Sequence, residues 1–581
     1  MGFNNFLKEL KRRHVIKASI SYVVFSWLII QAASILYPLM DLGQDAQRIT
    51  LYILIIGFPI WIVFAYIFDW TSSGFKKTTD DFEETSYIDT NKRMNAIIIF
   101  GLSLVVLLLI VDRVFNITRA PGNYDHDKSI AVLAFADMSP NKDQEYFSDG
   151  ISEEILNLLA KVRDLKVTSR TSSFAYKGKE ENIKQMGKEL NVAHILEGSV
   201  RKSGNTLRIT AQLINSKDGT HIWSETYDRE LSDIFEIQDE IAGHVTQQLK
   251  ATILNEVVVT PPDPKAYDLY LQGMFNWNKL TPESLDEALK YFEMALDIDT
   301  NYVLAYAGIA DVWIGKLQQG LATYTESIPK IEEAVAKGMA IDTTVAEIYE
   351  SKAHLCWINW KFDESRIAFK KAIQLNPNLS RARVYYGHAL IFSNQLEESR
   401  QEMDIALQLD PFNSLYKAIY GQSLNFTRQY DKAIELFESA LEASPRDPVA
   451  LANLRTTYHM KGMYDKALEV WKASYDAKGD HEAIEVLTKG VIDGGYQKAL
   501  EDLAMLLIDR SDSIYVTPWQ IATLYTRASQ KEKALIWLQK AYDIHDANMP
   551  YIGVDPIFDI LKGDPRFSNL LKKMNLSVDN K

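Results

Sequence analysis

The spacing of apolar residues divides the chain into three parts. Long apolar runs dominate the first 116 residues, short runs and alternating positions fill 129–254, and beyond 265 apolar residues recur every three or four positions. Long runs are typical of membrane helices, short alternating runs of strands, and the three-to-four period of amphipathic helices. We therefore expect a multidomain protein with a membrane region, a small α/β domain and an all-α region.

Three apolar stretches in the amino-terminal part suit a membrane anchor. They lie at 15–36, 51–68 and 96–111, and with their flanks they approach the roughly 20 residues that a helix needs to cross the hydrocarbon core. We predict that residues 1–116 form a three-span anchor and that 117–128 form a linker. The alternative for the first stretch is a cleaved signal peptide, which the two later stretches make the weaker interpretation.

Lysines and arginines in the short loops predict the orientation of this anchor. Four basic residues precede the first stretch and four lie between the second and third, whereas only Arg48 lies between the first and second. Basic loops tend to stay in the cytoplasm. We therefore expect the amino terminus to be cytoplasmic and residues after about 116 to lie on the outer side.

Residues 129–254 carry the pattern of a small α/β domain. The runs SIAVLAF (129–135) and LKVTSR (165–170) predict buried strands, and apolar residues at helical spacing follow each of them. Three further strands are expected around turns at 203–205 and 217–219, because apolar and polar residues alternate along them. The predicted order is β-α-β-α-β-β-β-α, a mixed sheet with an antiparallel meander.

The acidic stretch DGISEEI raises the question of a catalytic or metal site. Asp149, Glu153 and Glu154 surround Gly150 and Ile151. Acids of this kind also occur at the start of a helix, where they cap free N–H groups and face the positive end of the helix dipole. We favour the helix start, with Asp149 as the capping residue.

Five blocks of this region together resemble a known bacterial module. They are SIAVLAFADMS, EYFSDGISEEILNLLAK, VTSRTSSFAYKGK, AHILEGSVRKSGNTLRITAQLI and DGTHIWSETYDRELSDIFEIQDEIA. Over about 129–250 the chain is similar to the amino-terminal domain of TolB and to the FlgO family. The resemblance implies a periplasmic, non-catalytic domain beside tetratricopeptide repeats. In related chains the cytoplasmic end is a nucleotide cyclase or a winged-helix DNA-binding domain, for which the predicted cytoplasmic parts of this chain are too short.

A 34-residue period runs through the carboxyl-terminal half. It repeats a proline (Pro377, Pro411, Pro445), an alanine (Ala372, Ala406, Ala440) and a bulky residue (Phe369, Met403, Phe437). This register resembles tetratricopeptide (TPR) repeats, which are helix pairs that stack into a superhelix with a concave groove.

The repeat register also sets the predicted domain limits. Gly387 and Gly421 hold the small position of the first helix, but a further copy from about 448 has Arg455 there. Looser copies lie at about 266–301, 302–345 and 515–548. We predict a Pro-rich linker at 255–264, a superhelix at 265–549 and a carboxyl-terminal cap at 550–581.

The groove of such a stack is lined by the first helix of each pair. The predicted partner-binding residues are Glu350, His354, Trp357, Arg381, His388, Gln422 and Asn425. The alternative is a solvated polar face that binds nothing in particular. His354 and His388 occupy equivalent positions in adjacent repeats, but the spacing of the neighbouring residues does not favour a metal site.

Charge and motifs argue against nucleic-acid binding and catalysis. The net charge is −14, whereas nucleic-acid binding needs a basic face. The sequence has no phosphate-binding loop, nucleophile elbow, H-E-x-x-H or C-x-x-C motif. Its one cysteine, Cys356, falls at a core position of a repeat helix. We expect no catalytic residue, no cofactor, no metal and no nucleic-acid partner.

The favoured function is therefore non-catalytic. We expect a multi-pass protein of the bacterial inner membrane that contacts the lipid bilayer and binds a protein or peptide of the cell envelope through its periplasmic repeats, as scaffold or sensor. The alternatives are a transmembrane signalling subunit that relays a periplasmic event to a cytoplasmic partner, and an enzyme without a recognised motif.

Overall fold

A computed structural model describes residues 126–162, 164–179, 181–251 and 262–576, together with scattered positions between 19 and 77. The chain separates into two compact units, Met1–Asn123 and Tyr124–Lys581. Most of the predicted membrane spans, and all of the one at 96–111, lie outside the described residues. Within the described part, no helix is long and apolar enough to cross a membrane.

The described positions of the first unit show two apolar stretches in contact. The Tyr22 hydroxyl donates a hydrogen bond to the Leu54 carbonyl oxygen over 2.9 Å, and the Tyr22 ring centroid lies 5.5 Å from that of Phe58. These contacts join the first predicted span to the second. After the second, β1 (Phe68–Thr71) and β2 (Gly74–Lys77) pair as an antiparallel hairpin.

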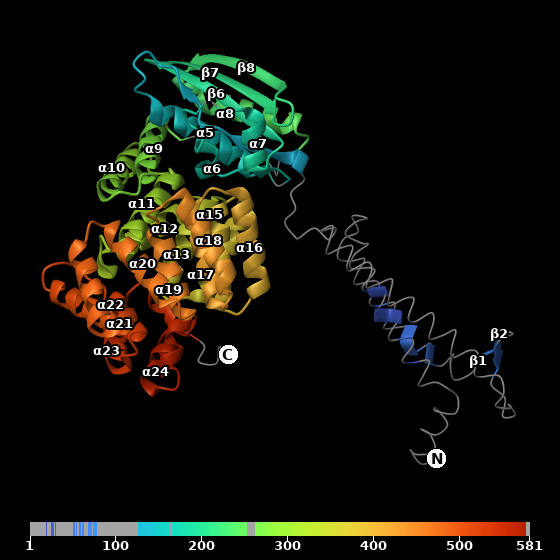
Figure 1. The fold of residues 1–581 in the computed structure, drawn as a ribbon. Helices are drawn as coiled ribbons and strands as arrows, with labels where there is room; N and C mark the ends of the chain where they lie inside the picture. Colours follow the sequence, from blue (N-terminus) through green and yellow to red (C-terminus); the bar gives the residue numbers. More distant parts are fainter. Residues whose placement is uncertain are drawn as a thin grey trace. The chain divides into compact units, whose positions relative to one another are not determined.

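The second unit begins with the predicted α/β domain (Figure 1). Its elements are η2 (His126–Lys128), β3 (Ser129–Val132), β4 (Ala136–Asp137), α5 (Glu145–Ala160), β5 (Lys166–Val167), α6 (Arg170–Phe174), α7 (Ile183–Leu190), β6 (His194–Ser203), β7 (Thr206–Asn215), β8 (His221–Glu230), η3 (Leu231–Asp233) and α8 (Ile234–Gln248). The strand order is β5-β3-β6-β7-β8, and β4 also pairs with β6. Strands β3, β4 and β5 run parallel to their neighbours, whereas β6, β7 and β8 form an antiparallel meander. The predicted mixed sheet is confirmed.

Alternation along β7 explains how this sheet is covered. Leu207, Ile209, Ala211 and Leu213 are fully buried in the core that they share with residues of α5 and α8. The residues between them point to the other face of the sheet, because successive side chains of a strand alternate. One face of the meander is therefore apolar and covered by helices, and the other is polar.

The prediction that Asp149 caps a helix was wrong. Helix α5 begins four residues earlier, with Gln144 at its N-cap. Asp149 lies inside the helix and accepts hydrogen bonds from the Lys177 ammonium at 2.6 and 2.8 Å, while Glu153 pairs with Arg170 at 2.9 Å. Burial raises the pKa of Asp149, whereas the hydrogen bond and charge of Lys177 act to lower this pKa. These two acids thus bind α6 and the loop after it to α5. Their partners, Arg170 and Lys177, are too distant in sequence for a local pattern to indicate them.

Helix pairs form the rest of the unit. They are α9 (Pro264–Trp277) and α10 (Pro282–Ile298), α11 (Val303–Gln318) and α12 (Tyr324–Ile341), α13 (Ala346–Ile358) and α14 (Phe362–Leu375), α15 (Ser380–Ile391) and α16 (Leu396–Leu409), α17 (Ser414–Phe426) and α18 (Tyr430–Ala443), α19 (Pro448–Met460) and α20 (Tyr464–Asp476), then α21 (His481–Arg510), α22 (Pro518–Arg527) and α23 (Lys531–Asp543). The predicted helical superhelix is confirmed.

The small position of the repeat shows why its register is strict. A Cβ added at Gly421 would lie 2.5 Å from the ring of Phe437, so the first helix can approach the second only without a side chain there. At the equivalent position the Arg455 guanidinium instead stacks on Trp471, with its Cζ 3.6 Å from the ring centroid. The departure from the repeat pattern is thus accommodated by a flat cation–π contact.

Helix α21 is a helix pair that the 34-residue period does not reveal. Its backbone is non-helical at Gly494 and Gly495, and Gly495 has a φ of +80°, which favours glycine. A Cβ added at Gly490 would lie 2.5 Å from the Cα of Ala499. The two halves therefore turn back on each other at the glycines, like the other pairs.

The carboxyl-terminal segment turns back toward earlier repeats. It contains η4 (Met549–Gly553), η5 (Pro556–Leu561) and α24 (Pro565–Lys573), of which α24 packs against α23. Just before η4, the imidazole of His545 stacks on Trp360 with ring centroids 3.7 Å apart. Arg428 pairs with Asp559 of η5 at 2.8 Å. This segment therefore closes over repeats far from it in sequence.

Loops between repeats hold the α/β domain. The buried Asn378 amide donates to the carbonyl oxygens of Ala160 and Leu165, each over 2.9 Å, and its oxygen accepts from the Val167 N–H over 3.1 Å. One loop further along, Asp410 accepts hydrogen bonds from the N–H and hydroxyl of Ser172 at 3.0 and 2.6 Å. The α/β domain and the middle repeats thus share buried polar contacts.

We expect Asn378→Ala to loosen this contact. The change leaves three buried backbone groups without partners, so the free energy of unfolding should fall by about 2 kcal/mol, and the Val167 N–H should exchange with solvent faster. Asn301→Ala is the matched control, because Asn301 is exposed at the equivalent loop position. Hydrogen exchange and urea unfolding measure both effects. Equal protection of Val167 in the wild type and Asn378→Ala would contradict the interface.

Candidate functional site

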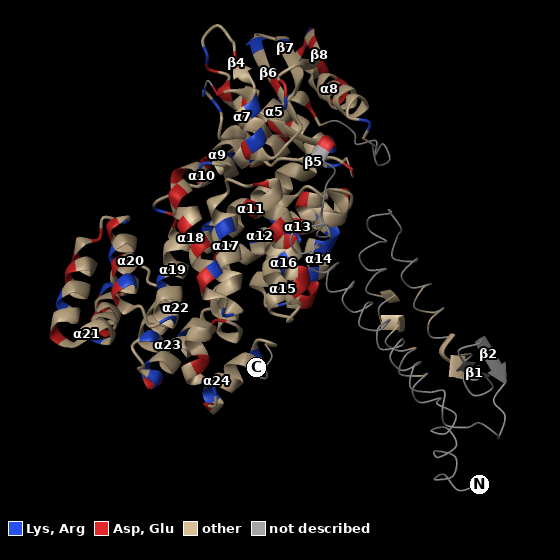
Figure 2. Cartoon of the chain, turned by 45° about the vertical axis from the view of Figure 1, so that its right-hand side comes forward, with Lys and Arg blue, Asp and Glu red and all other residues tan. Residues whose placement is uncertain are grey.

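The predicted groove residues all lie on the first helices of three adjacent pairs. Helix α13 carries Glu350, His354 and Trp357, α15 carries Arg381 and His388, and α17 carries Gln422 and Asn425. We call this side of the stack the inner face. The outer helix α16 carries exposed charges of both signs (Figure 2).

A charged cluster joins the first of these helices. Arg381 hydrogen-bonds Glu350 and reaches Asp311 of α11 at 2.5 Å, and the Ser351 hydroxyl donates to the same Asp311 at 2.9 Å. The Arg381 Cζ also lies 5.1 Å from the ring centroid of Trp277 on α9. One guanidinium therefore connects four first helices.

Burial sets the electrostatics of this cluster. Glu350 is fully buried, and burial raises its pKa to about 7, although the Arg381 charge and hydrogen bond act to lower it. The Arg381 side chain keeps a quarter of its surface exposed. The cluster thus presents a fixed cation to solvent over a carboxylate that solvent does not reach.

An aromatic cluster lies at the other end of the same helices. The ring centroids of Trp357 and His388 are 6.0 Å apart, and Phe392 and Phe426 complete the group. Tyr551 of η4 lies 5.7 Å from both His388 and Phe426. This part of the predicted groove is therefore covered by the chain's own carboxyl-terminal segment.

Both inner-face histidines are buried and neutral. Burial lowers the pKa of His354 to about 3 and that of His388 to about 4. The Nε2 of His354 is 4.0 Å from Glu350, and the Nδ1 of His388 is 3.2 Å from the Ser423 hydroxyl oxygen. Among the described residues, no group of three or more potential metal ligands is found.

The two residues of α17 behave differently from each other. Asn425 is buried and bridges to the next first helix, because its Oδ1 accepts from Thr457 at 2.8 Å and its Nδ2 donates to the Asn453 carbonyl at 3.3 Å. Gln422 is half-buried, and its side chain has no hydrogen bond within the described part of the chain. The structure thus brings Glu350 and Arg381 together, leaves Gln422 available and uses Asn425 for packing.

A basic cluster that the sequence pattern did not show lies further along. Arg527 of α22 is buried and donates to the Thr456 hydroxyl at 2.7 Å and to the Thr523 carbonyl at 3.1 Å. Burial and the charge of Arg527 lower the pKa of Arg455 to about 10. Within the described residues, neither guanidinium has a carboxylate in ion-pair contact. The charge of Asp555 acts to raise the pKa of Arg527, so a carboxylate partly offsets this cluster.

Comparisons with known proteins agree on the repeats. The tetratricopeptide repeat family model matches residues 346–379 and 427–485, so these segments are tetratricopeptide repeats. Neither match covers 129–250, and the TolB-like and FlgO-like resemblance stays a prediction.

Two curated relatives match only parts of this chain. "Putative adenylate cyclase 3" of Rhizobium meliloti is 38% identical over 223 residues, which are 36% of this chain and 37% of that protein. "Transcriptional regulator HilA" of Salmonella typhimurium is 25% identical over 128 residues, 22% of this chain and 23% of that protein. The chain therefore spans less than half of the length of each relative.

Solved structures with similar segments include two repeat proteins. YrrB, described as a TPR protein with an unusual peptide-binding site, is 21% identical, with a TM-score of 0.24 over 33% of this chain and 94% of that one. A tetratricopeptide repeat protein from Parabacteroides merdae is 15% identical, with a TM-score of 0.27 over 54% of this chain and 99% of that one.

We expect Arg381→Met to destabilise the protein strongly. It leaves Glu350 buried without its cation, which typically costs about 3 kcal/mol or more of unfolding free energy. Arg400→Met is the matched control, since the exposed Arg400 also pairs with two carboxylates, Glu397 and Asp404, and should cost less than about 1 kcal/mol. Urea unfolding measures both. Similar losses in the two variants would contradict a buried structural role for the Arg381 cluster.

We expect His388 to make stability depend on pH. Its folded-state pKa of about 4 lies below the unfolded value of about 6.5, so its contribution is complete above pH 6.5 and is lost as the pH falls. The unfolding free energy of the wild type, minus that of His388→Asn, should therefore decrease by about 1.4 kcal/mol per pH unit between pH 6 and 4.5. A difference that does not change with pH would contradict a buried, neutral His388.

Proposed function

We propose that this protein is a non-catalytic interaction protein that binds a protein or peptide on the inner face of its repeats. The observation that carries the proposal is the Arg381 cluster, where one partly exposed guanidinium is held in place by Glu350 and Asp311. A side chain fixed in this way loses little entropy on binding and recognises carboxylates with defined geometry. Tetratricopeptide repeats support a protein or peptide partner.

The proposed location is the bacterial inner membrane, with the repeats in the periplasm as an envelope scaffold or sensor. Support for it comes from the three apolar stretches and from the basic residues that flank them. The contact of Tyr22 with Leu54 and Phe58 supports packing between the first two stretches.

A signalling subunit is the second candidate. Its support is the relative named putative adenylate cyclase 3, which shares 223 residues with this chain. In that case the apolar region would pass a periplasmic event to a cytoplasmic partner. The two candidates differ in one respect: a scaffold binds its partner with or without the apolar region, whereas a signalling subunit needs that region for its output.

Gln422 is the position from which to test partner binding. We expect a photo-crosslinking amino acid at position 422 to capture a protein in intact cells, because the half-buried Gln422 side chain makes no hydrogen bond within the described residues that the substitution would remove. Ile367 on the outer helix α14 is the control, with 71% of its surface exposed. Mass spectrometry of the adducts identifies the partner. The proposal fails if position 422 captures nothing that position 367 does not capture equally.

A further inference from the structure

The topology of the α/β domain creates a switch point at β3. This strand lies between β5 and β6 and is parallel to both. Ile130 and Val132 share a core with α5, whereas Ala131 on the opposite face packs with Met186 and Leu190 of α7. The connections on the two sides of β3 therefore lie on opposite faces of the sheet. In open α/β sheets, the crevice beyond the carboxyl end of such a strand is where ligands bind.

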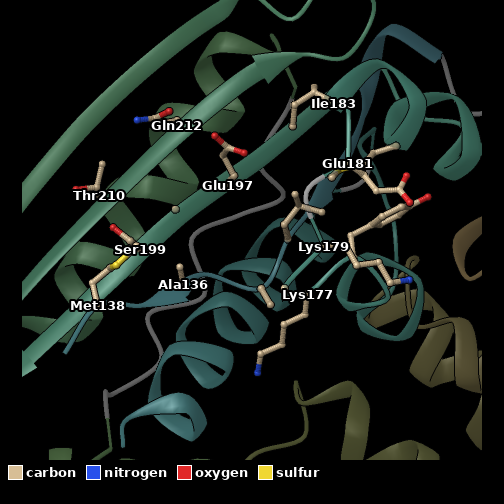
Figure 3. A pocket seen from close by; sticks show the side chains of 16 residues that line it. Ala136, Met138, Lys177, Lys179, Glu181, Ile183, Glu197, Ser199, Thr210 and Gln212 are labelled. Carbon is tan, nitrogen blue, oxygen red and sulfur yellow. The ribbon is translucent and has the colours of Figure 1, made fainter. Parts of the chain in front are cut away.

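An open pocket of about 470 Å³ lies at this place. Leu133 and Ala134, which follow β3, line one side, and the loop after α6, from Tyr176 to Lys179, lines another. Strands β6 and β7 supply the floor with Glu197, Ser199, Thr210 and Gln212 (Figure 3). The pocket belongs to the α/β domain and is separate from the inner face of the repeats.

Three polar side chains of the floor make no hydrogen bond or ion pair within the described residues. Glu197 lies directly opposite Gln212, and Ser199 opposite Thr210, in the register of β6 and β7. Thr210 contacts Thr226, with hydroxyl oxygens 3.2 Å apart. The side chains of Glu197, Ser199 and Gln212 have no hydrogen bond or ion pair within the described part of the chain. They form a row of one carboxylate, one hydroxyl and one amide on the polar face of the sheet.

Within the described residues, no cation of the wall forms an ion pair with the Glu197 carboxylate. Lys177 lines the pocket with its carbon chain, but its ammonium is held by Asp149 and Glu145 at 2.6 Å each, and in Figure 3 it points away from the floor residues. The Lys179 ammonium lies 5.9 Å from the Tyr176 ring centroid, and Glu181 adds a second carboxylate to the lining.

The remaining wall of the pocket is apolar. It contains Leu133, Ile183 and Met186, none of which can hydrogen-bond a polar ligand through its side chain. A ligand that fits both surfaces needs a hydrogen-bond donor with positive charge at one end and an apolar body at the other, because an anion would be repelled by Glu197.

We propose that this pocket binds a small organic amine, with its ammonium on Glu197 and its apolar body against Leu133, Ile183 and Met186. Gln212 and Ser199 accept the other ammonium hydrogens. This assignment is independent of peptide binding by the repeats, since the pocket and the inner face share no residue.

Three probes of similar size and different charge test the assignment. They are 2-phenylethylamine, 2-phenylethanol and 3-phenylpropionate, titrated into the purified full-length chain by calorimetry and ligand-observed NMR. A charge-assisted hydrogen bond should give the amine at least about tenfold tighter binding than the alcohol, and the propionate should bind more weakly than the alcohol. The assignment is overturned if no probe binds, or if the amine binds no more tightly than the alcohol.

Variants locate the site. Glu197→Gln should bring the affinity for the amine down to that for the alcohol, and Glu197→Lys should make 3-phenylpropionate the preferred probe. Glu236→Gln is the matched control, because Glu236 is an exposed residue of α8 and the substitution removes the same charge. If Glu197→Gln keeps the preference for the amine, or Glu236→Gln abolishes it, this pocket is not the binding site.

Discussion

The burial of polar side chains between two domains is the constraint on which the second unit depends. Asn378 and Asp410 lie in loops between repeats, and both are almost completely buried. A buried amide or carboxylate without partners costs about 1–3 kcal/mol or more. Ala160, Leu165, Val167 and Ser172 of the α/β domain are partners of these two side chains, and Asp410 also accepts a hydrogen bond from Asn413 of its own loop. Because the Asn378 amide and one Asp410 oxygen find these partners only across the domain contact, the α/β domain and the middle repeats stabilise each other.

The contact between the α/β domain and the repeats also involves residues next to both candidate sites, the inner face and the sheet pocket. Asn378 lies two residues before the start of α15, which carries Arg381 and His388, so the same loop that holds the α/β domain leads into an inner-face helix. Phe412, from the next loop, lies with its ring centroid 6.0 Å from that of Tyr176, a residue that lines the sheet pocket. The pocket wall therefore rests on the repeat stack. Binding at one site would influence the other only if it changed this contact, since coupling requires two arrangements that both ligands distinguish.

The sequence predicted what depends on local periodicity. The spacing of Pro377, Pro411 and Pro445 gave the repeats, and alternation along 206–215 gave the meander. It could not place contacts between distant residues. Asp149 looked like a helix cap because Lys177, its partner 28 positions away, has no local signature. The helix pair of α21 was missed because Gly479, and not a proline, stands at the next step of the 34-residue period. The helical face that carries the groove residues was predictable from the repeat register. Asp311, which pairs with Arg381, and Tyr551, which packs on His388, lie outside that register.

The carboxyl-terminal segment determines which part of the inner face a partner could use. The ring of Tyr551 packs on His388, which also contacts Trp357, and the imidazole of His545 stacks on Trp360. These contacts remove apolar surface that would otherwise attract partners without selectivity. Among the predicted groove residues, they leave two polar groups: the exposed part of Arg381 and Gln422, whose side chain makes no hydrogen bond in the described part of the chain. Recognition restricted to such groups draws its affinity from hydrogen bonds and charge, whose geometry discriminates between partners more sharply than apolar contact does. A repeat stack closed by its own carboxyl-terminal segment therefore favours a selective partner with a defined polar end over a broad hydrophobic one.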